Sequence, residues 1–296
     1  MTTLEQINIE TQINSFPALP LIVTKVMAVT ADPESSAEDL MKVILPDQSM
    51  CSTILKIANS AFFGIPREVS TMERALMVLG FEEVRNIVIG KALFAAFPKL
   101  GKEFRETVTL FWQHAFTCGL TAKIMGETMG ISPSELFVAG LIHDIGKLAM
   151  LTLFGDKYPL LRELTDPGRS DSASEELTEF KISHDRVGLL LANRWLLPSK
   201  LTMAIGHHHC PGDAPSNKQF PILIQTADIL SLMYCSPDFL GAEDTMKIFE
   251  DFLPETRDLW AENDLKWDII NIGTWYNTLA ERFEQDQAIL DIFTSS

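Results

Sequence analysis

The sequence of 296 residues has no histidine before residue 114 and none after residue 209. Its six histidines lie between these limits, at His114, His143, His184, His207, His208 and His209. Imidazole is the side chain that changes charge near neutral pH and the commonest metal ligand in proteins. The two ends of the chain therefore lack this chemistry, and any metal or acid–base site is expected in the central segment.

Cysteine is scarce and scattered. The four thiols, at Cys51, Cys118, Cys210 and Cys235, form no Cys-x-x-Cys pair. This spacing argues against a disulfide framework and against a zinc site built from paired thiolates. We expect a protein of the reducing cytoplasm.

Basic residues are also few, with 24 Lys and Arg against 40 Asp and Glu, for a formal net charge of −16. This balance repels the phosphate backbone of nucleic acid and anionic membrane surfaces, so neither is an expected partner. The sequence has no run of about 18 apolar residues, so no membrane span is expected. The first residues, Met1–Glu5, lack the basic and apolar regions of a signal peptide.

The apolar pattern is helical throughout, and no stretch alternates as a strand would. Breaks are expected at Asp32-Pro33, Pro46-Asp47, Gly64 and Gly80. Ser36 with Asp39 has the spacing of a capping box. The predicted fold is an all-α, multi-helix bundle with three parts: an N-terminal helical lobe (1–100), a helical lobe that carries the histidines (101–235) and a C-terminal helical extension (236–296).

The stretch Gly140–Lys147 places His143 and Asp144 side by side after an apolar run. Neighbouring helical residues point about 100° apart, so such a pair can reach one ion from two directions. A pair alone is more often a surface or capping pair. His114 precedes His143 by 29 residues, enough for a helix, a turn and an antiparallel return that brings both to one site.

Further donors arrive from other predicted helices, with His184 on one, His208 and His209 at the end of another, and Asp228 on a third. Imidazole and carboxylate without thiolate suit one or two divalent transition-metal ions, namely Fe, Mn, Co, Ni or Zn. His184 has an alternative role, in which it caps a helix or pairs with Asp185 or Arg186.

Two sequence blocks in the first hundred residues carry a family resemblance. The block Leu55–Gly64, read as Leu-Lys-Ile-Ala-Asn-Ser-Ala-Phe-Phe-Gly, and the block Ala75–Asn86 resemble the HDOD domain, a bacterial relative of the HD phosphohydrolases found as a signalling module. The resemblance covers roughly residues 15 to 235. In these blocks Asn59 and Ser60 are expected to hydrogen-bond backbone groups at a helix end, and Asn86 to do likewise.

The resemblance implies that His114, the His143-Asp144 pair and Asp228 match the four ligand positions of the HD superfamily. It further implies that His184, His208 and His209 match the extra ligands of its two-metal subgroup, the HD-GYP phosphodiesterases, while His207 is a spare. Lys147 matches the position that meets a substrate phosphate, and Asp144 with Lys147 would carry any catalysis. Cys210–Pro215 stands where the HD-GYP family has its glycine-rich segment, which argues against cyclic-dinucleotide hydrolysis.

Two functions follow as hypotheses. The first is a signalling or regulatory HDOD-type module with a metal-bound core that binds a signalling protein or a small phosphorylated effector. The alternative is a metal-dependent phosphohydrolase or phosphodiesterase acting on a nucleotide or another phosphoester.

The tail contains Trp260, Trp267 and Trp275. Because buried tryptophan carries a large apolar area, we expect them to pack onto the body of the protein, with packing onto a partner as the alternative.

Overall fold

The computed structural model describes residues 11–13, 16–60, 63–97, 102–158, 172–235, 256–266, 269–286, 289–290 and 292. All regular structure in these ranges is helical, which confirms the all-α prediction. The chain divides into two units. Unit 1 comprises Met1–Phe16 and Lys99–Ala280, and unit 2 comprises Pro17–Pro98 and Glu281–Ser296.

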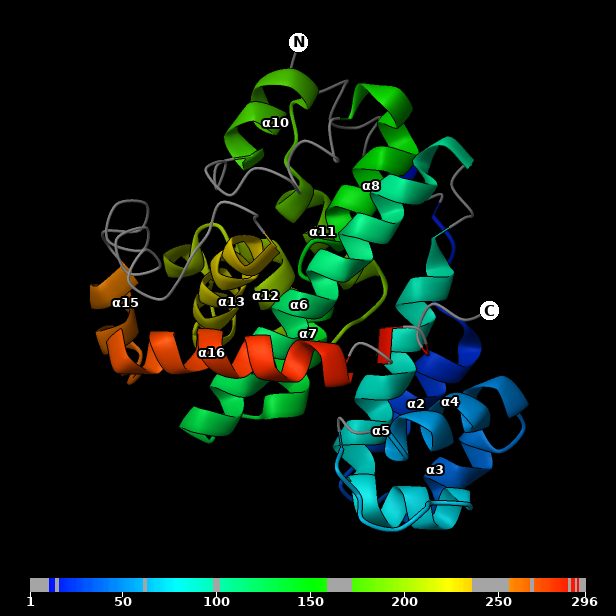
Figure 1. Ribbon diagram of the computed structural model, residues 1–296. Coiled ribbons are helices and arrows are strands. Elements are labelled where there is room, and N and C mark those ends of the chain that lie inside the picture. Colours follow the sequence, from blue (N-terminus) through cyan, green and yellow to red (C-terminus); the bar gives the residue numbers. More distant parts are fainter. Residues whose placement is uncertain are drawn as a thin grey trace. The chain divides into compact units, whose positions relative to one another are not determined.

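Unit 2 is built from four helices in the described residues, coloured blue to cyan in Figure 1: α2 (Leu21–Ala31), α3 (Ala37–Ile44), α4 (Gln48–Ala58) and α5 (Met72–Ala96). Its helix α5 packs against the other three. The predicted break at Gly80 is a kink in α5, where the backbone takes φ 83°. Ser36 and Asp39 form the predicted capping box at the start of α3.

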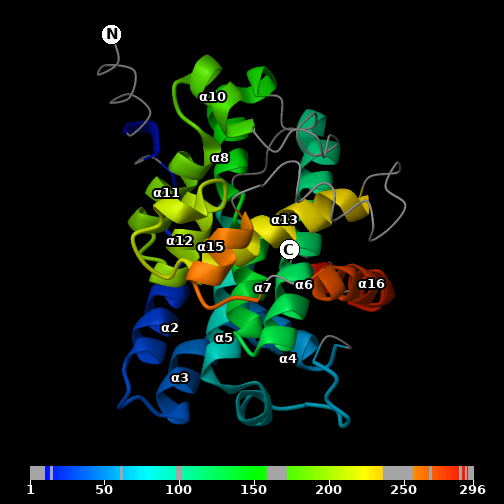
Figure 2. The same cartoon turned by 90° about the vertical axis from the view of Figure 1, so that its left-hand side faces the viewer.

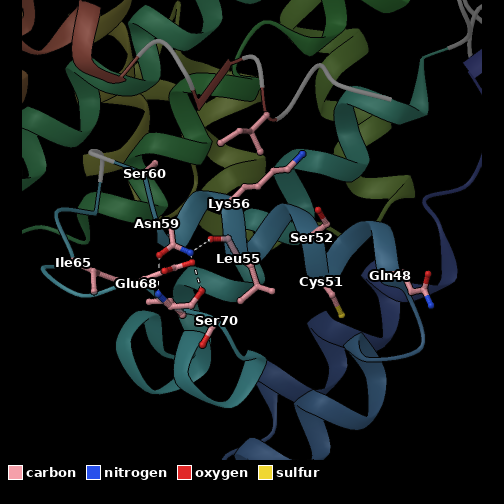
Figure 3. A pocket seen from close by; sticks show the side chains of 12 residues that line it. Gln48, Cys51, Ser52, Leu55, Lys56, Asn59, Ser60, Ile65, Glu68 and Ser70 are labelled. Atoms are coloured by element: carbon pink, nitrogen blue, oxygen red, sulfur yellow. Dashed lines mark hydrogen bonds between the residues drawn. The ribbon is translucent and has the colours of Figure 1, made fainter.

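Asn59 fastens the end of α4 to the loop that follows it (Figure 3). Its Nδ2 donates to the carbonyl oxygens of Leu55 and Val69, both at 2.8 Å, and its Oδ1 accepts from the Val69 N–H at 2.7 Å. Ser60 Oγ donates to the Ile57 carbonyl oxygen at 2.6 Å. The predicted backbone role of these two residues is therefore confirmed. A groove of about 1130 Å³ lies beside them, between α4 and Ile65–Ser70.

Unit 1 contains the histidines. Its longer helices are α6 (Arg105–Met129), α7 (Pro133–Ile142), α8 (Ile145–Phe154), α10 (Ser172–Phe180), α11 (His184–Arg194), α12 (Ser199–His207), α13 (Gln219–Cys235), α15 (Thr256–Glu262) and α16 (Ile269–Asp286), of which Glu281–Asp286 are assigned to unit 2. Three short 3₁₀ turns cover Lys102–Phe104, Gly155–Lys157 and Pro211–Asp213. Helix α7 packs on α6, α12 and α13, and α8 packs on α11 (Figure 2).

Two glycine contacts set these spacings. A Cβ on Gly140 of α7 would lie 2.7 Å from the Cα of Gly119 on α6, so only glycine lets these two helices approach so closely. A Cβ on Gly146 of α8 would overlap the carbonyl oxygen of His184 at the start of α11. Both Gly140 and Gly146 flank the His143-Asp144 pair, so the close approaches bring neighbouring helices to that pair.

The stretch Pro133–Lys157 is apolar and long enough to cross a membrane by composition, but 89% of its apolar window is buried inside the structure. It is also broken at His143 and Asp144, which separate α7 from α8. Burial within a bundle accounts for its apolar character, as for the central helix of a folded core.

The described part of the tail also packs inward. Trp260 and Trp275 are fully buried in unit 1, and the Trp275 indole Nε1–H donates to Thr128 Oγ1 at 3.2 Å. Packing onto the body is thus confirmed for these two residues. Trp267 lies outside the described residues.

Candidate metal centre

The break between α7 and α8 is the middle of the site. His143 ends α7 and Asp144 begins α8, so both side chains leave the helix axis at one point. His114 comes from the middle of α6, and Asp228 comes from α13. His184 is the first residue of α11, while His208 and His209 follow the end of α12.

The structure brings all seven predicted donors together in two sets. The ligand atoms within each set lie within 4.8 Å of one another. Set A consists of His114, His143 and Asp228, and set B consists of Asp144, His184, His208 and His209. His207, the predicted spare, belongs to neither set.

Asp144 faces both sets with different oxygens. Its Oδ2 lies 3.4 Å from His143 Nε2 and 3.7 Å from His114 Nε2. Its Oδ1 lies 3.2 Å from His184 Nε2 and 3.4 Å from His208 Nε2. This is the arrangement that a carboxylate needs to bridge two neighbouring cations.

The hydrogen bonds of the rings show which nitrogen faces inward. His143 Nδ1–H donates to the Gly140 carbonyl oxygen at 2.7 Å. His208 Nδ1–H donates to the carbonyl oxygens of Ala204 and Ile205, at 3.2 and 3.0 Å. A carbonyl oxygen only accepts, so the proton sits on Nδ1 and Nε2 presents a lone pair to the centre. Metal-ligating histidines are typically oriented in this way by an outer acceptor.

The inward atoms lack partners of their own. His143 Nε2 and Asp144 Oδ1 are buried and receive no hydrogen bond in the described part of the chain. His184 Nε2 also lies 2.9 Å from His209 Nε2 and 3.4 Å from His208 Nε2, so three ring nitrogens crowd together. Buried polar atoms left unsatisfied cost about 1–3 kcal/mol each, and more where they are charged. One or two divalent cations would satisfy all of them at once, so this donor set fits a metal.

In the absence of a cation, protons on some of these donors must balance the charge of the carboxylates. Burial lowers the pKa of His143, but the Asp144 carboxylate and other neighbours outweigh it and hold that pKa well above its usual range. Burial also opposes ionisation of Asp144, yet His143 and Lys147 hold its pKa well below the usual range. Desolvation depresses the pKa of His209 instead, helped by the neighbouring His208 and His184. The centre thus holds a mixture of charged and neutral imidazoles around ionised carboxylates.

Lys147 lies one turn into α8 and is 7% exposed. Its Nζ is 2.7 Å from Asp144 Oδ2, on the side of set A. A buried ammonium in this place balances part of the negative charge of Asp144 and Asp228.

Sequence reasoning missed Glu176. Its Oε2 accepts from the Nδ1–H of His184 at 2.8 Å, so His184 pairs with neither Asp185 nor Arg186 through that nitrogen. The chain reverses between the two residues at Lys181, which adopts φ 64°. A left-handed non-glycine turn gives little signal in sequence, and the other two acidic residues of α10, Glu175 and Glu179, are exposed.

A family model described as the HDOD domain matches residues 16–211 of the chain. Among curated proteins, an uncharacterized protein of Treponema pallidum is 23% identical over 227 residues, which are 76% of this chain and 43% of that protein. Ribonuclease Y of Thermus thermophilus is 29% identical over 119 residues, or 40% of this chain and 16% of the enzyme. The chain therefore spans less than half the length of these curated relatives.

Solved structures share the fold. An HDOD domain protein of unknown function from Geobacter sulfurreducens superposes with a TM-score of 0.67 at 20% identity, over 99% of this chain and 97% of that one. A protein from Shewanella amazonensis, provisionally named a phosphohydrolase, gives a TM-score of 0.71 at 21% identity, over 96% and 97% of the two chains. At these identities the likeness extends to the fold and no further.

Proposed function

Because the chain belongs to the HDOD domain family, we propose that it is a regulatory signalling module whose helical core holds one or two divalent transition-metal ions. The observation that carries the metal is that His143 Nε2, Asp144 Oδ1 and Asp228 Oδ1 are buried in the centre and have no hydrogen bond in the described residues. Set A and set B would each hold one ion, with Asp144 shared between them. Imidazole with carboxylate favours Fe, Mn, Co, Ni or Zn.

Burial supports a regulatory role over rapid turnover. His143 and His184 are fully buried, and His114 is 4% exposed. An enzyme site keeps an open coordination position that its substrate can reach. Here only His209 and Asp228, one donor from each set, have intermediate exposure. A metal in this centre would tie α6, α7, α11 and α13 together, and a partner protein or a small phosphorylated effector could act on that packing.

The decisive experiment is elemental analysis of full-length protein purified without a histidine tag and without chelator. We expect at least one equivalent of transition metal per chain, and loss of that metal in a His143→Ala variant. His207→Ala serves as the matched control, because His207 belongs to neither donor set, and it should retain wild-type metal. Metal-free wild-type protein that also fails to bind Mn, Fe, Co, Ni or Zn on addition would overturn the proposal.

The second candidate, a metal-dependent phosphohydrolase, is favoured by the position of Lys147 beside Asp144. When bound, a divalent metal lowers the pKa of water and withdraws charge from a phosphate. Lys147 would add a fixed positive charge next to the phosphate oxygens, and Asp144 would orient that ammonium. Removing one preorganised donor from an oxyanion hole costs about 2.7–4 kcal/mol, which sets the scale for such a fixed charge.

The two candidates are separated by turnover. Protein reconstituted with Mn, Fe, Co or Ni should hydrolyse generic phosphomonoesters and phosphodiesters more slowly than about 1 s⁻¹ if it is a regulatory module. Faster turnover that falls at least 100-fold in Lys147→Met would establish the phosphohydrolase instead. Lys200→Met is the control, since Lys200 pairs with Glu135 away from the histidines.

A further inference from the structure

The histidine rings of the site are not all held alike. His143 and His208 donate their Nδ1–H to backbone carbonyl oxygens of their own helix ends. His184 donates to a carboxylate, that of Glu176, which comes from a different helix. A carboxylate partner makes an imidazole a stronger metal ligand and fixes its orientation. The His114 ring is also held from another helix, because its Nδ1 lies 3.3 Å from Ser231 Oγ of α13, but of these four rings only that of His184 is held by a carboxylate at its Nδ1.

Glu176 is built into this contact. It is 2% exposed, although its neighbours Glu175 and Leu177 on α10 are exposed. Its Oε2 accepts from both the backbone N–H and the Nδ1–H of His184, at 2.6 and 2.8 Å. Its Oε1 accepts from the Tyr158 hydroxyl at 2.5 Å. Three donors thus converge on one buried carboxylate, and they use both of its oxygens.

Tyr158 extends the connection to α8. The residue follows the 3₁₀ turn Gly155–Lys157 at the end of α8 and is 4% exposed. Helix α8 begins directly after Asp144, whose Oδ1 lies 3.2 Å from His184 Nε2. A closed path therefore runs from Asp144 along α8 to Tyr158, through Glu176 to His184, and back to Asp144. The last step of this path is the 3.2 Å contact between His184 Nε2 and Asp144 Oδ1.

We infer that Glu176 is a positioning residue for set B, and that a metal ion in set B fastens α10 to the core by binding both His184 and Asp144 at the ends of this path. The inference rests on the proposed metal site and extends it, because it names α10 as the helix that responds to a metal ion in set B. Without an ion, His184 and Asp144 meet only in the 3.2 Å contact between Nε2 and Oδ1, and α10 is held by Glu176 and its side-chain packing. With an ion, any motion of α10 that withdraws Glu176 must disturb a ligand. Coupling of this kind is reciprocal, so a partner that displaces α10 would weaken metal binding by the same factor.

The test measures Co²⁺ affinity of full-length protein by competition with a chelator. In Glu176→Gln, the amide supplies one acceptor oxygen where two are needed. The affinity of one Co²⁺ equivalent should fall 10–100-fold while that of the other changes less than about 2-fold. Glu179→Gln is the matched control, because Glu179 is an exposed residue of the same helix, and it should bind like wild type. An equal loss for both equivalents, or no loss, would overturn the inference.

A second measurement follows α10 itself by hydrogen exchange with and without Co²⁺. Addition of Co²⁺ should slow exchange in Ser172–Phe180 in wild type and in Glu179→Gln, but not in Glu176→Gln. Exchange in α10 that ignores Co²⁺ in wild type would refute the coupling. If Glu176→Gln does not fold, Tyr158→Phe keeps the ring and both His184 contacts, and we expect a smaller loss of roughly 3-fold for one equivalent. Failure of wild type to bind Co²⁺ would instead refute the proposed metal site on which this inference rests.

Discussion

Unit 2 and unit 1 treat buried polar groups in opposite ways. In unit 2, Asn59 uses its amide to make three hydrogen bonds with the backbone of Leu55 and Val69. In unit 1, His143 Nε2 and Asp144 Oδ1 are buried and accept none in the described residues. The first arrangement stabilises a loop by itself, whereas the second is complete only when a cation arrives. A polar cluster that is left unsatisfied in a core is therefore better evidence of a ligand than a polar cluster as such.

Asn86 of unit 2 departs from this contrast. The expectation that Asn86 hydrogen-bonds backbone groups was wrong, because neither its Oδ1 nor its Nδ2 has a hydrogen-bond partner in the described residues, although Asn86 is 2% exposed. Asn59 sits at a helix end, where backbone groups are free, while Asn86 lies inside α5, where they are already paired. The same residue type thus satisfies backbone groups only where the helix leaves some available.

The largest effect on metal binding is expected when the charge of the shared carboxylate, Asp144, is removed. Asp144→Asn keeps the shape but removes the charge that both donor sets use, so Co²⁺ affinity should fall at least 100-fold for both equivalents. Elemental analysis and chelator competition measure the loss. Asp213→Asn is the control, because Asp213 is exposed in the turn after the histidine doublet and should have no effect. Retention of one tight equivalent in Asp144→Asn would contradict a shared ligand.

The pH dependence of metal binding is a second test of the difference between the two units, because the described residues of unit 2 include no histidine. Burial lowers the pKa of His184, but Glu176 and Asp144 outweigh it and raise that pKa to about 10. The raised pKa means that protonated His184 stabilises metal-free protein fully below pH ~6.5, and that this contribution is lost as pH rises through about 10.

A metal needs the neutral ring, so binding at neutral pH expels this proton. Co²⁺ affinity should therefore rise about 10-fold per pH unit from pH 6.5 to 8.5. Chelator competition at a series of pH values gives the slope, and Glu176→Gln should flatten it by removing the largest interaction that raises the pKa. Affinity that stays constant over this range would show that His184 is already neutral in the metal-free protein.

The sequence predicted the donors better than it predicted what positions them. His143, Asp144 and His114 could be found because adjacent polar residues in an apolar run, and a spacing of one helical hairpin, are local patterns. Glu176 could not, because the reversal at Lys181 decides which face of α10 turns inward. The helices themselves follow from apolar periodicity and from caps such as Ser36 and Asp47. How closely the helices approach depends on glycine contacts between segments, which periodicity does not reveal.

Gly140→Ala tests that last point. The added Cβ would lie 2.7 Å from the Gly119 Cα, and this backbone atom cannot turn aside. We expect a loss of about 2 kcal/mol in the free energy of unfolding, from overpacking partly offset by better helix propensity. Urea unfolding of metal-free protein measures it, and Co²⁺ affinity should fall as well because α6 and α7 carry His114 and His143.

Gly212→Ala is the matched control for this pair. A Cβ there would meet only Leu259 Cδ1, at 3.9 Å, which is ordinary contact. Its effect on unfolding should stay within about 0.5 kcal/mol. A Gly140→Ala variant as stable as this control would show that α6 and α7 can separate without cost, and the close helix contact would then not be what holds the two histidines together.

The smallest effect is expected in unit 2. It tests whether the hydrogen bonds of Asn59 and the donors around Asp144 act independently. Asn59→Ala removes three hydrogen bonds and leaves the N–H of Val69, a residue only 1% exposed, without its partner. The local free energy of opening, measured by hydrogen exchange at the Val69 amide, should fall by about 1–2 kcal/mol. Gln48→Ala, an exposed change on the same helix, should leave it unchanged. Co²⁺ affinity should be the same in both variants, because Asn59 satisfies only groups within unit 2. If Asn59→Ala instead weakened Co²⁺ binding 10-fold, the hydrogen bonds of Asn59 and the donors around Asp144 would be energetically coupled. The two groups of polar residues would then not act independently.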